Sequence, residues 1–526
     1  MDEDKKTFQG YKGRALETLK KYDVHVWDKA EVETTRGHFS GKILPRAENT
    51  DDIHIVMKVS TGYNIGIDID TITDMKGERD PQPVFKIPEK EFPYTPGLPH
   101  VKLLGTGGTI ASRLDYRTGA VIPAFSPGEL YGAVPELADI CNLQTEKVFA
   151  VFSENMSPVE YMALANKIGK EIEAGIEGIV IGHGTDTLAH TAAALTYMCQ
   201  NMPMPVVLVG SQRSSDRPSS DAALNLMHAM TAAGHGDIAE VMVCMFGPTS
   251  DDYGFLHRGT RVRKMHSSYR STFRTIGDTP LATVNRKDGI QPIKEVYNHR
   301  RRGQRQIEVI TNYEDYKRSI AKNDPNVTRI VPTFDDRVAI LYYYPGMKPD
   351  VLDALIDNGY KGIVWDGTGL GHVNKGMFDA IQRATDAGIH QYMSVQTIWG
   401  YTHMFVYDTG RDMMARGIIP ADNMLAESSY IKLGWALGLT KDSGQKREDV
   451  KKLMLTPIND EITKREPYDG YLVYQGGTFY YKGIALGLKM EKSILHVGLQ
   501  PHTTLATIYQ VLFRFVFVVQ RRLLAT

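Results

Sequence analysis

Two glycine-rich turns carry the side chains best suited to chemistry. "KLLGTGGTIASR", residues 102–113, sets Thr109 behind a short apolar run, and "GIVIGHGTDTLAHTAAAL", residues 178–195, repeats the arrangement with Thr185 and Asp186. Glycine lets the backbone approach a bound molecule closely, and a hydroxyl beside a base can act as a nucleophile. The pair of turns therefore predicts a site that attacks an electrophilic substrate.

Two other interpretations of these turns compete with a reactive hydroxyl. Thr and Asp are preferred helix N-caps, so the first turn taken alone is better explained as a cap, and the second could also be one. Phosphate binding fails on spacing, because counting from Gly105 puts Ile110 where a dinucleotide fingerprint needs its third glycine, and the Gly-Lys-Ser/Thr ending of a P-loop is absent. The reactive-hydroxyl interpretation gains its weight from the pairing of the turns.

The elements around both turns indicate an α/β fold. Short apolar runs, each followed by a glycine or serine turn and a helical pattern, are "VKLLG", "GIVIG", "PVVLVG" and "VMVCMF". This alternation is typical of a parallel sheet wrapped by helices, in which ligands bind at the carboxyl ends of the strands. Both threonine turns are expected at that edge.

The chain divides in order along its length. Alternating apolar and polar runs at the start predict a small β-barrel, and a proline-rich charged stretch follows as a linker. The predicted parts are the barrel at 1–80, the linker at 81–100, an α/β domain with the active site at 101–290, a connecting excursion at 291–336, a smaller C-terminal α/β domain at 337–460 and a tail at 461–526.

Composition excludes several functional classes. Lys and Arg number 61 against 62 Asp and Glu, so no global field attracts nucleic acid or an anionic membrane. The three cysteines show no C-x-x-C spacing and are expected to be inert core residues. A charged start and the lack of a long apolar run predict a cytoplasmic protein with no membrane contact.

"TGGTIA" followed by "HGTDT" resembles the L-asparaginase family of amidohydrolases. The likeness continues in "GSQRSSDRPSSDAALNL", "RGTRVRKMHSSY", "YKGIVWDGTGLGHV" and "GIIPADNMLAESSYIKLGWALG", and it covers roughly residues 101–455. The small barrel in front, with "GHFSGKILPR" and "GYNIGID", resembles the front of the D subunits of archaeal glutamyl-tRNA(Gln) amidotransferases. These D subunits are the specific family that the chain resembles.

The resemblance implies release of ammonia from glutamine or asparagine, with Thr109 and Thr185 as the two candidate nucleophiles. Asp186 and Lys264, the latter in "RVRKMH", fall where the family completes a Thr-Asp-Lys relay. Tyr116 matches the family's mobile tyrosine, which closes over the substrate; without the resemblance, an ordinary surface-loop tyrosine explains it nearly as well.

The family grips the α-carboxylate and α-amino groups of the substrate at positions that match Ser153 and Glu154, for which a helix cap is the alternative. His183 has no ligand cluster at a suitable spacing and is expected to be a packed, hydrogen-bonded residue and not a metal ligand. Asp221 and Asn225 lie in a segment that the family keeps beside its active site, and we expect them only to support it.

The family resemblance also implies partners. An E subunit would bind ATP and Mg²⁺ and amidate Glu-tRNA(Gln), two copies of each chain would assemble, this chain would form a homodimer, and it would bind no cofactor itself. The arginines of "HRRRGQR", residues 299–305, are expected in a solvated loop, so tRNA contact falls mainly to the partner.

Two alternatives stay open: a free L-asparaginase of amino-acid catabolism, and a catalytically silent scaffold that binds tRNA or an amino acid. The barrel and linker favour the amidotransferase assignment, and the set of Thr109, Thr185, Asp186 and Lys264 argues against the scaffold. After "EPYDGYLVYQGG" the likeness to the family stops, and no function is assigned to the remaining tail.

Overall fold

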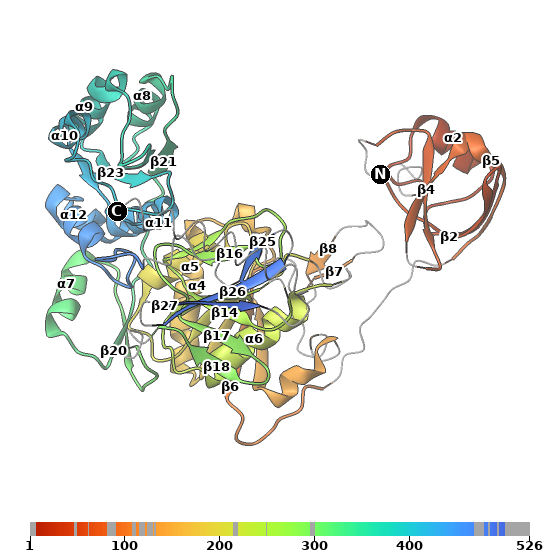
Figure 1. Cartoon of the computed structure of the whole chain (residues 1–526), viewed down its shortest axis with the longest axis horizontal. Coiled ribbons are helices and arrows are strands. Elements are labelled where there is room, and N and C mark those ends of the chain that lie inside the picture. Colours follow the sequence, from red (N-terminus) through yellow and green to blue (C-terminus); the bar gives the residue numbers. More distant parts are fainter. Residues whose placement is uncertain are drawn as a thin grey trace.

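The fold is seen in a computed structural model. It describes residues 7–46, 50–61, 63–80, 91–107, 112–114, 121–123, 130, 133–213, 219–248, 250–294, 300–467, 478–481, 484–491 and 494–499. Figure 1 shows a small N-terminal domain standing apart from a larger body in which two α/β units lie side by side. In the described part of the chain, no helix combines the length and the apolar character that crossing a membrane requires.

The N-terminal domain is an antiparallel sheet of five strands in the order β4-β3-β2-β1-β5, as the alternating pattern predicts. Residues such as Val32, Ile55 and Met57 point inward and meet Leu19 of the helix α2 in a core of their own. Its elements are α2 (Gly13–Lys21), β1 (Lys29–Thr34), β2 (Gly37–Ile43), β3 (His54–Val59), β4 (Asn64–Asp68), η1 (Ile69–Thr71) and β5 (Ile72–Glu78).

The first α/β unit is built on an eight-stranded sheet in the order β18-β17-β14-β13-β12-β10-β6-β9. The strands from β9 to β13 are parallel, and β14, β17 and β18 are antiparallel. Along β10, Ile179 and Ile181 face the core that α4 and α5 cover, whereas Val180 faces the core under α6. The sheet is therefore covered on both faces, as a parallel sheet requires.

The strands of this unit are β6 (His100–Gly105), β7 (Ser112–Leu114), β8 (Val121–Pro123), β9 (Asn142–Lys147), β10 (Gly178–Gly182), β11 (Cys199–Gln200), β12 (Val206–Val209), β13 (Val241–Phe246), β14 (Gly254–Arg258), β15 (Val262–Lys264), β16 (Phe273–Thr275), β17 (Ala282–Asn285) and β18 (Gly289–Pro292). Its helices are η3 (Pro135–Asp139), η4 (Ser153–Asn155), α4 (Pro158–Glu173), α5 (Leu188–Met198) and α6 (Ala222–His235). The four buried runs quoted from the sequence thus form β6, β10, β12 and β13, which confirms the predicted strands. All three cysteines, Cys141, Cys199 and Cys244, are buried as expected.

The two threonine turns follow the two strands at which the strand order reverses. After β6 the chain builds β9 on one side of it, and the next strand, β10, lies on the other side. In open α/β sheets, ligands bind at such a switch point, outside the carboxyl ends of the strands. Topology therefore puts the turns after Gly105 and Gly182 next to each other.

The prediction that residues 291–336 form an excursion is wrong for most of that segment. β19 (Gln306–Val309) and β20 (Val327–Ile330) form a three-stranded sheet with β11, and the helix α7 (Tyr313–Lys322) connects them. Tyr313 and Ile330 join the main core. Arg300, Arg302 and Arg305 are partly buried and bond to other segments, whereas Arg301 is exposed. Arg302, for example, donates to the carbonyls of Ala233 and Gly236 at the end of α6, where the free carbonyls favour a cation.

The second α/β unit is a parallel sheet in the order β21-β22-β23-β24. Its helix α11 packs against α5 of the first unit as well as against β21 and β22, so both units share one core. The elements are β21 (Val338–Tyr342), α8 (Asp350–Asp357), β22 (Gly362–Gly367), η6 (Lys375–Met377), α9 (Phe378–Asp386), β23 (His390–Val395), α10 (Asp408–Ala415), β24 (Ile418–Pro420), α11 (Ala426–Leu439), η7 (Lys441–Ser443) and α12 (Arg447–Leu455).

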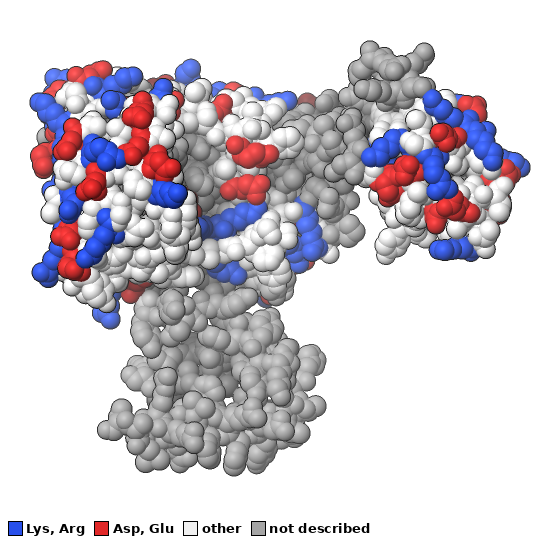
Figure 2. Space-filling model, turned by 90° about the horizontal axis from the view of Figure 1, so that it is seen from above, with Lys and Arg blue, Asp and Glu red and all other residues white. Residues whose placement is uncertain are grey.

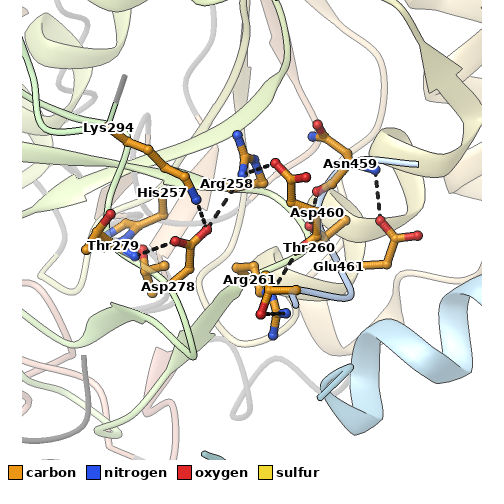
Figure 3. Close-up of polar contacts among 12 residues, drawn as sticks. His257, Arg258, Thr260, Arg261, Asp278, Thr279, Lys294, Asn459, Asp460 and Glu461 are labelled. Carbon is orange, nitrogen blue, oxygen red and sulfur yellow. Dashed lines mark hydrogen bonds and ion pairs between the residues drawn. The ribbon is translucent and has the colours of Figure 1, made fainter. Parts of the chain in front are cut away.

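The segment after α12, residues 456–467, locks the two units together through buried polar contacts. Arg258 donates to the Asp460 carboxylate at 2.6 Å, and the Thr260 hydroxyl donates to the carbonyl of Asn459 at 3.0 Å (Figure 3). Beyond it, β25 (Thr478–Tyr481), β26 (Ile484–Glu491) and β27 (Ile494–Leu499) form an antiparallel sheet. Lys432 of α11 donates to Glu461 in the segment 456–467, so the segment bonds to both units and helps to fix their relative position.

Candidate active site

The first turn contacts the second directly through its backbone. The amide N–H and the Oγ1 hydroxyl of Thr106 both donate to the carbonyl oxygen of Gly182, at 3.0 Å each. Gly107 has a φ of 121°, and a Cβ there would lie 2.2 Å from the carbonyl oxygen of Val151. Only glycine fits that position.

Glycines also make room for the second turn. A Cβ on Gly184 would lie 2.8 Å from the Ser153 side chain, and a Cβ on Gly210 would lie 2.8 Å from the methyl carbon of Thr185. The hydroxyl of Thr187 donates to the carbonyl of Ser153 at 2.6 Å. The segments that follow β6, β9, β10 and β12 therefore converge on Thr185.

Lys264 completes a three-residue chain of polar side chains. Its Nζ lies 2.9 Å from Thr185 Oγ1 and 2.8 Å from Asp186 Oδ1, although it is 78 residues away from Asp186 in sequence. The Thr185 side chain is buried and that of Lys264 is 14% exposed, whereas that of Asp186 is 67% exposed. The Lys264 amine thus contacts both the Thr185 hydroxyl and the Asp186 carboxylate, and the hydroxyl lies at the buried end of this chain of side chains.

The side chains of Thr185 and Asp186 do not cap the helix α5. Thr187 is the N-cap residue of α5, and no side chain donates or accepts a capping hydrogen bond there. Thr185 and Asp186 instead meet Lys264, so their side chains are available for chemistry.

His183 is a packed histidine, as predicted. It is fully buried, with Nδ1 2.7 Å from the carbonyl oxygen of Gly184 and Nε2 2.9 Å from the hydroxyl of Thr191. Burial lowers the pKa of His183 to about 4, so the ring is neutral at pH 7. The tautomer that satisfies both contacts carries its proton on Nδ1 and fixes the backbone just before Thr185.

Asp221 and Asn225 hold the neighbouring loop after β12. The Asp221 carboxylate accepts from the backbone N–H of Gln212 and Arg213, and Asn225 Nδ2 donates to Asp221 at 2.9 Å and to the carbonyl of Gly210 at 3.0 Å. Gly210 is the residue that packs against Thr185. These two side chains therefore support the loop beside the candidate site.

Ser153 and Glu154 are not the cap of α4. Ser157 is the N-cap, and it forms a capping box with Glu160. Ser153 is buried against the second turn, whereas Glu154 is exposed. The structure therefore brings Ser153 next to the turn of Thr185, while Thr109 and Tyr116 lie outside the described residues.

Sequence reasoning missed Thr187, which ties the second turn to Ser153, and it missed Arg261 and Arg263. The signal for the arginines was present as the two-residue spacing in "RVRK", because alternate residues of a strand lie on one face. Among the described residues, no group of three or more His, Cys, Asp and Glu side chains could hold a metal ion.

Comparison with known proteins agrees with this architecture. Residues 24–76 match the family model described as the GatD N-terminal domain, residues 100–296 match Asparaginase, N-terminal, and residues 337–454 match the Glutaminase/Asparaginase C-terminal domain. The D subunit of the glutamyl-tRNA(Gln) amidotransferase of Methanopyrus kandleri is 44% identical over 456 residues, which cover 86% of this chain and 94% of that protein. The D subunit of the Thermococcus kodakarensis amidotransferase is 43% identical over 88% of this chain and 100% of that protein.

The chain belongs to the family of glutamyl-tRNA(Gln) amidotransferase D subunits. The predicted family and the enzyme class, the asparaginase-like part of an amidotransferase, are thereby confirmed.

Solved asparaginases share the fold of the α/β core in this family. The thermostable L-asparaginase from Thermococcus kodakarensis is 29% identical with a TM-score of 0.57, and it covers 69% of this chain and 99% of its own. L-asparaginase I from Vibrio cholerae, at 22% identity and a TM-score of 0.54, shows the fold alone over the same shares of the two chains. The predicted asparaginase-like α/β fold behind a small N-terminal β domain is confirmed.

Proposed function

We propose that this chain releases ammonia from glutamine for the amidation of Glu-tRNA(Gln), using Thr185, Lys264 and Asp186 as its proton relay. The observation that carries the proposal is the contact of Lys264 Nζ with both Thr185 Oγ1 and Asp186 Oδ1. An amide is a poor electrophile, so the attacking hydroxyl needs a base within hydrogen-bond reach.

The reaction follows from this geometry in two steps. Lys264, as a neutral amine, takes the hydroxyl proton of Thr185, and the freed oxygen attacks the carbonyl carbon of the side-chain amide. The C–N bond then breaks, and the nitrogen leaves as ammonia with the proton from Lys264. Water hydrolyses the resulting ester to glutamate and restores the hydroxyl. Asp186 orients the amine throughout.

Thr109 is the second candidate nucleophile, and Tyr116 is the candidate cover of the substrate. We assign the α-carboxylate and α-amino groups of glutamine to Ser153 and Glu154, since the Ser153 segment packs against the turn that carries Thr185. A carboxylate facing an ammonium forms a strong, charge-assisted hydrogen bond.

The tRNA and ATP chemistry is assigned to a partner E subunit. It would hold ATP and Mg²⁺, assemble as two copies with two copies of this chain, and make most contacts with Glu-tRNA(Gln). This chain would also form a homodimer. Figure 2 supports the division of labour, because Lys and Arg alternate with Asp and Glu over the visible described surface of the N-terminal domain. Such a surface is unlike a basic nucleic-acid footprint.

Ammonia release measured with glutamine or asparagine, with and without the E subunit and Glu-tRNA(Gln), tests the proposal. Glutamine should be hydrolysed slowly by the chain alone and faster in the full complex, because a closing cover couples the two reactions. Mass spectrometry of the trapped ester identifies the first nucleophile. Fast asparagine hydrolysis that ignores the partner would favour the free asparaginase, which the 29% identity to the Thermococcus enzyme keeps as second candidate.

A further inference from the structure

Strand β15, which carries Lys264, is a weak element by itself. It has three residues, and among the described strands it pairs only with β16, in a two-stranded sheet outside the main sheet. Isolated two-stranded ribbons are marginally stable in water. The position of the Lys264 amine must therefore be set by what the side chains of this strand contact.

The strand has two faces with different partners. Lys264 points toward Thr185 and Asp186, while Arg263, the preceding residue, contacts the C-terminal unit. Arg261 lies in the turn just before β15, two residues before Arg263, and it also contacts that unit. The second unit thus holds the back of the strand whose front carries the amine.

Arg261 is the fixed part of this contact. Its guanidinium is fully buried and donates to the carbonyl of Asn423 at 2.8 Å, to Asn423 Oδ1 at 2.9 Å and to the carbonyl of Asp460 at 3.0 Å. Figure 3 shows Arg261 beside the segment of Asp460. With so many satisfied donors, it anchors the start of the strand.

Arg263 and Glu427 form the second contact, closer to Lys264. Arg263 Nη2 lies 3.2 Å from Glu427 Oε1, with side-chain exposures of 35% and 22%. Glu427 stands in the first turn of α11, four residues after Asn423, where the helix N-terminus favours a carboxylate. Arg263 is its only ion-pair partner among the described residues.

The Glu427 carboxylate lies beside buried polar atoms that lack hydrogen-bond partners among the described residues, which makes its ion pair with Arg263 important. Glu427 Oε2 is buried and has no hydrogen-bond partner in the described part of the chain, and the same is true of Asp366 Oδ1. Burial and the charge of Glu427 together raise the pKa of Asp366 to about 6. Arg263 is the described cation that pairs with the Glu427 carboxylate, so this ion pair stabilises the negative charge of Glu427 in its partly buried position.

We propose that Glu427 is a positioning residue: through Arg263 it fixes β15 so that Lys264 reaches Thr185 and Asp186. This inference rests on the proposed function, in which the Lys264 amine moves the proton. The second unit then contributes to catalysis through the Arg263–Glu427 ion pair. A displacement of about 1 Å at a reacting group can lower a rate by about 10²-fold.

The test compares Glu427→Gln, Arg263→Gln, the double variant and Arg263→Lys in the full complex. Glu427→Gln keeps the size of the side chain and should lower kcat by about 10- to 100-fold, while KM stays within about twofold. The double variant should be no worse than either single one, because both break one contact. Arg263→Lys keeps the charge and should retain most of the activity.

The matched control is Asp353→Asn, which breaks the partly exposed Asp353–Arg383 ion pair in the same unit but away from β15. It should leave kcat unchanged. Hydrogen exchange of residues 260–266 gives a readout that needs no activity, and it should be faster in Glu427→Gln than in wild type or in the control.

A Glu427→Gln enzyme with wild-type kcat, or with a KM that rises as kcat falls, would overturn the inference, as would unchanged exchange of residues 260–266. If the thermal midpoint of the Glu427→Gln variant stays within about 2 °C of the wild-type value, a lower kcat reflects a displaced Lys264 and not loss of the fold. If wild type releases no ammonia under any condition, the proposed function fails, and the exchange measurement still decides whether Glu427 holds the strand.

Discussion

The decisive feature at the scale of single residues is one amine shared between a hydroxyl and a carboxylate. Thr185 is buried and Asp186 is largely exposed, so the Lys264 amine spans the boundary between protein and solvent. Water screens the exposed ion pair, which therefore adds little to stability. The arrangement makes sense as proton-transfer machinery more than as a structural bridge.

Thr185→Val removes the hydroxyl while keeping the shape of the side chain. We expect ammonia release by the full complex to fall by about 10²- to 10⁴-fold, since proton transfer to Lys264 is lost. The thermal midpoint should change little, because Lys264 keeps its contact with Asp186. Thr185→Ser, which keeps a hydroxyl, is the matched control and should remain active. Full activity of Thr185→Val would reject the relay.

Elements position these residues mainly through close backbone approaches. The turns after β6 and β10 were predictable, because strand, glycine turn and helix follow each other in the sequence and parallel strands end at one edge. The contacts of Gly184 with Ser153 and of Gly210 with Thr185 were not predictable, since they join segments that are distant in sequence. The same holds for Lys264, whose role came from the family resemblance and not from its spacing.

Gly210→Ala tests whether ammonia release needs the close approach of the Gly210 backbone to the Thr185 turn. The added Cβ would lie 2.8 Å from both the His183 carbonyl oxygen and the Thr185 methyl carbon, so the Thr185 turn must shift. We expect kcat to fall by about 10- to 100-fold in the ammonia-release assay. Gly303→Ala meets nothing within 4 Å and should behave as wild type. Equal rates for the two variants would show that the turn tolerates displacement.

At the scale of the whole molecule, the two α/β units behave as one body. Trp435 of α11 stacks on Tyr197 of α5, and the buried Lys432 bonds to Glu461 in the segment after α12. Sequence patterns indicated two units but could not indicate how they pack. The segment 291–336 was misjudged for the same reason, because Tyr313 and Ile330 look like ordinary loop and strand residues until their burial is seen.

Buried neutral histidines are spread through both units and should make the whole fold sensitive to acid. Burial lowers the pKa of His183, His228 and His390 to about 4 and that of His257 to about 3. In the unfolded chain these groups have a pKa of about 6.5. Between about pH 6.5 and about pH 4 the unfolded chain therefore binds protons that the folded chain does not.

Stability should consequently be independent of these groups above about pH 6.5 and should fall as the pH drops below it. Each histidine contributes a slope of about 1.4 kcal/mol per pH unit in this window. Burial raises the pKa of Asp366 to about 6 and also raises that of Asp422; these carboxyls act with the opposite sign, but they are two groups against four. Thermal midpoints recorded from about pH 8 to about pH 4.5 should fall steeply below about pH 6.5, and His228→Gln should make the fall shallower. A flat wild-type profile would contradict the assignment of neutral buried rings.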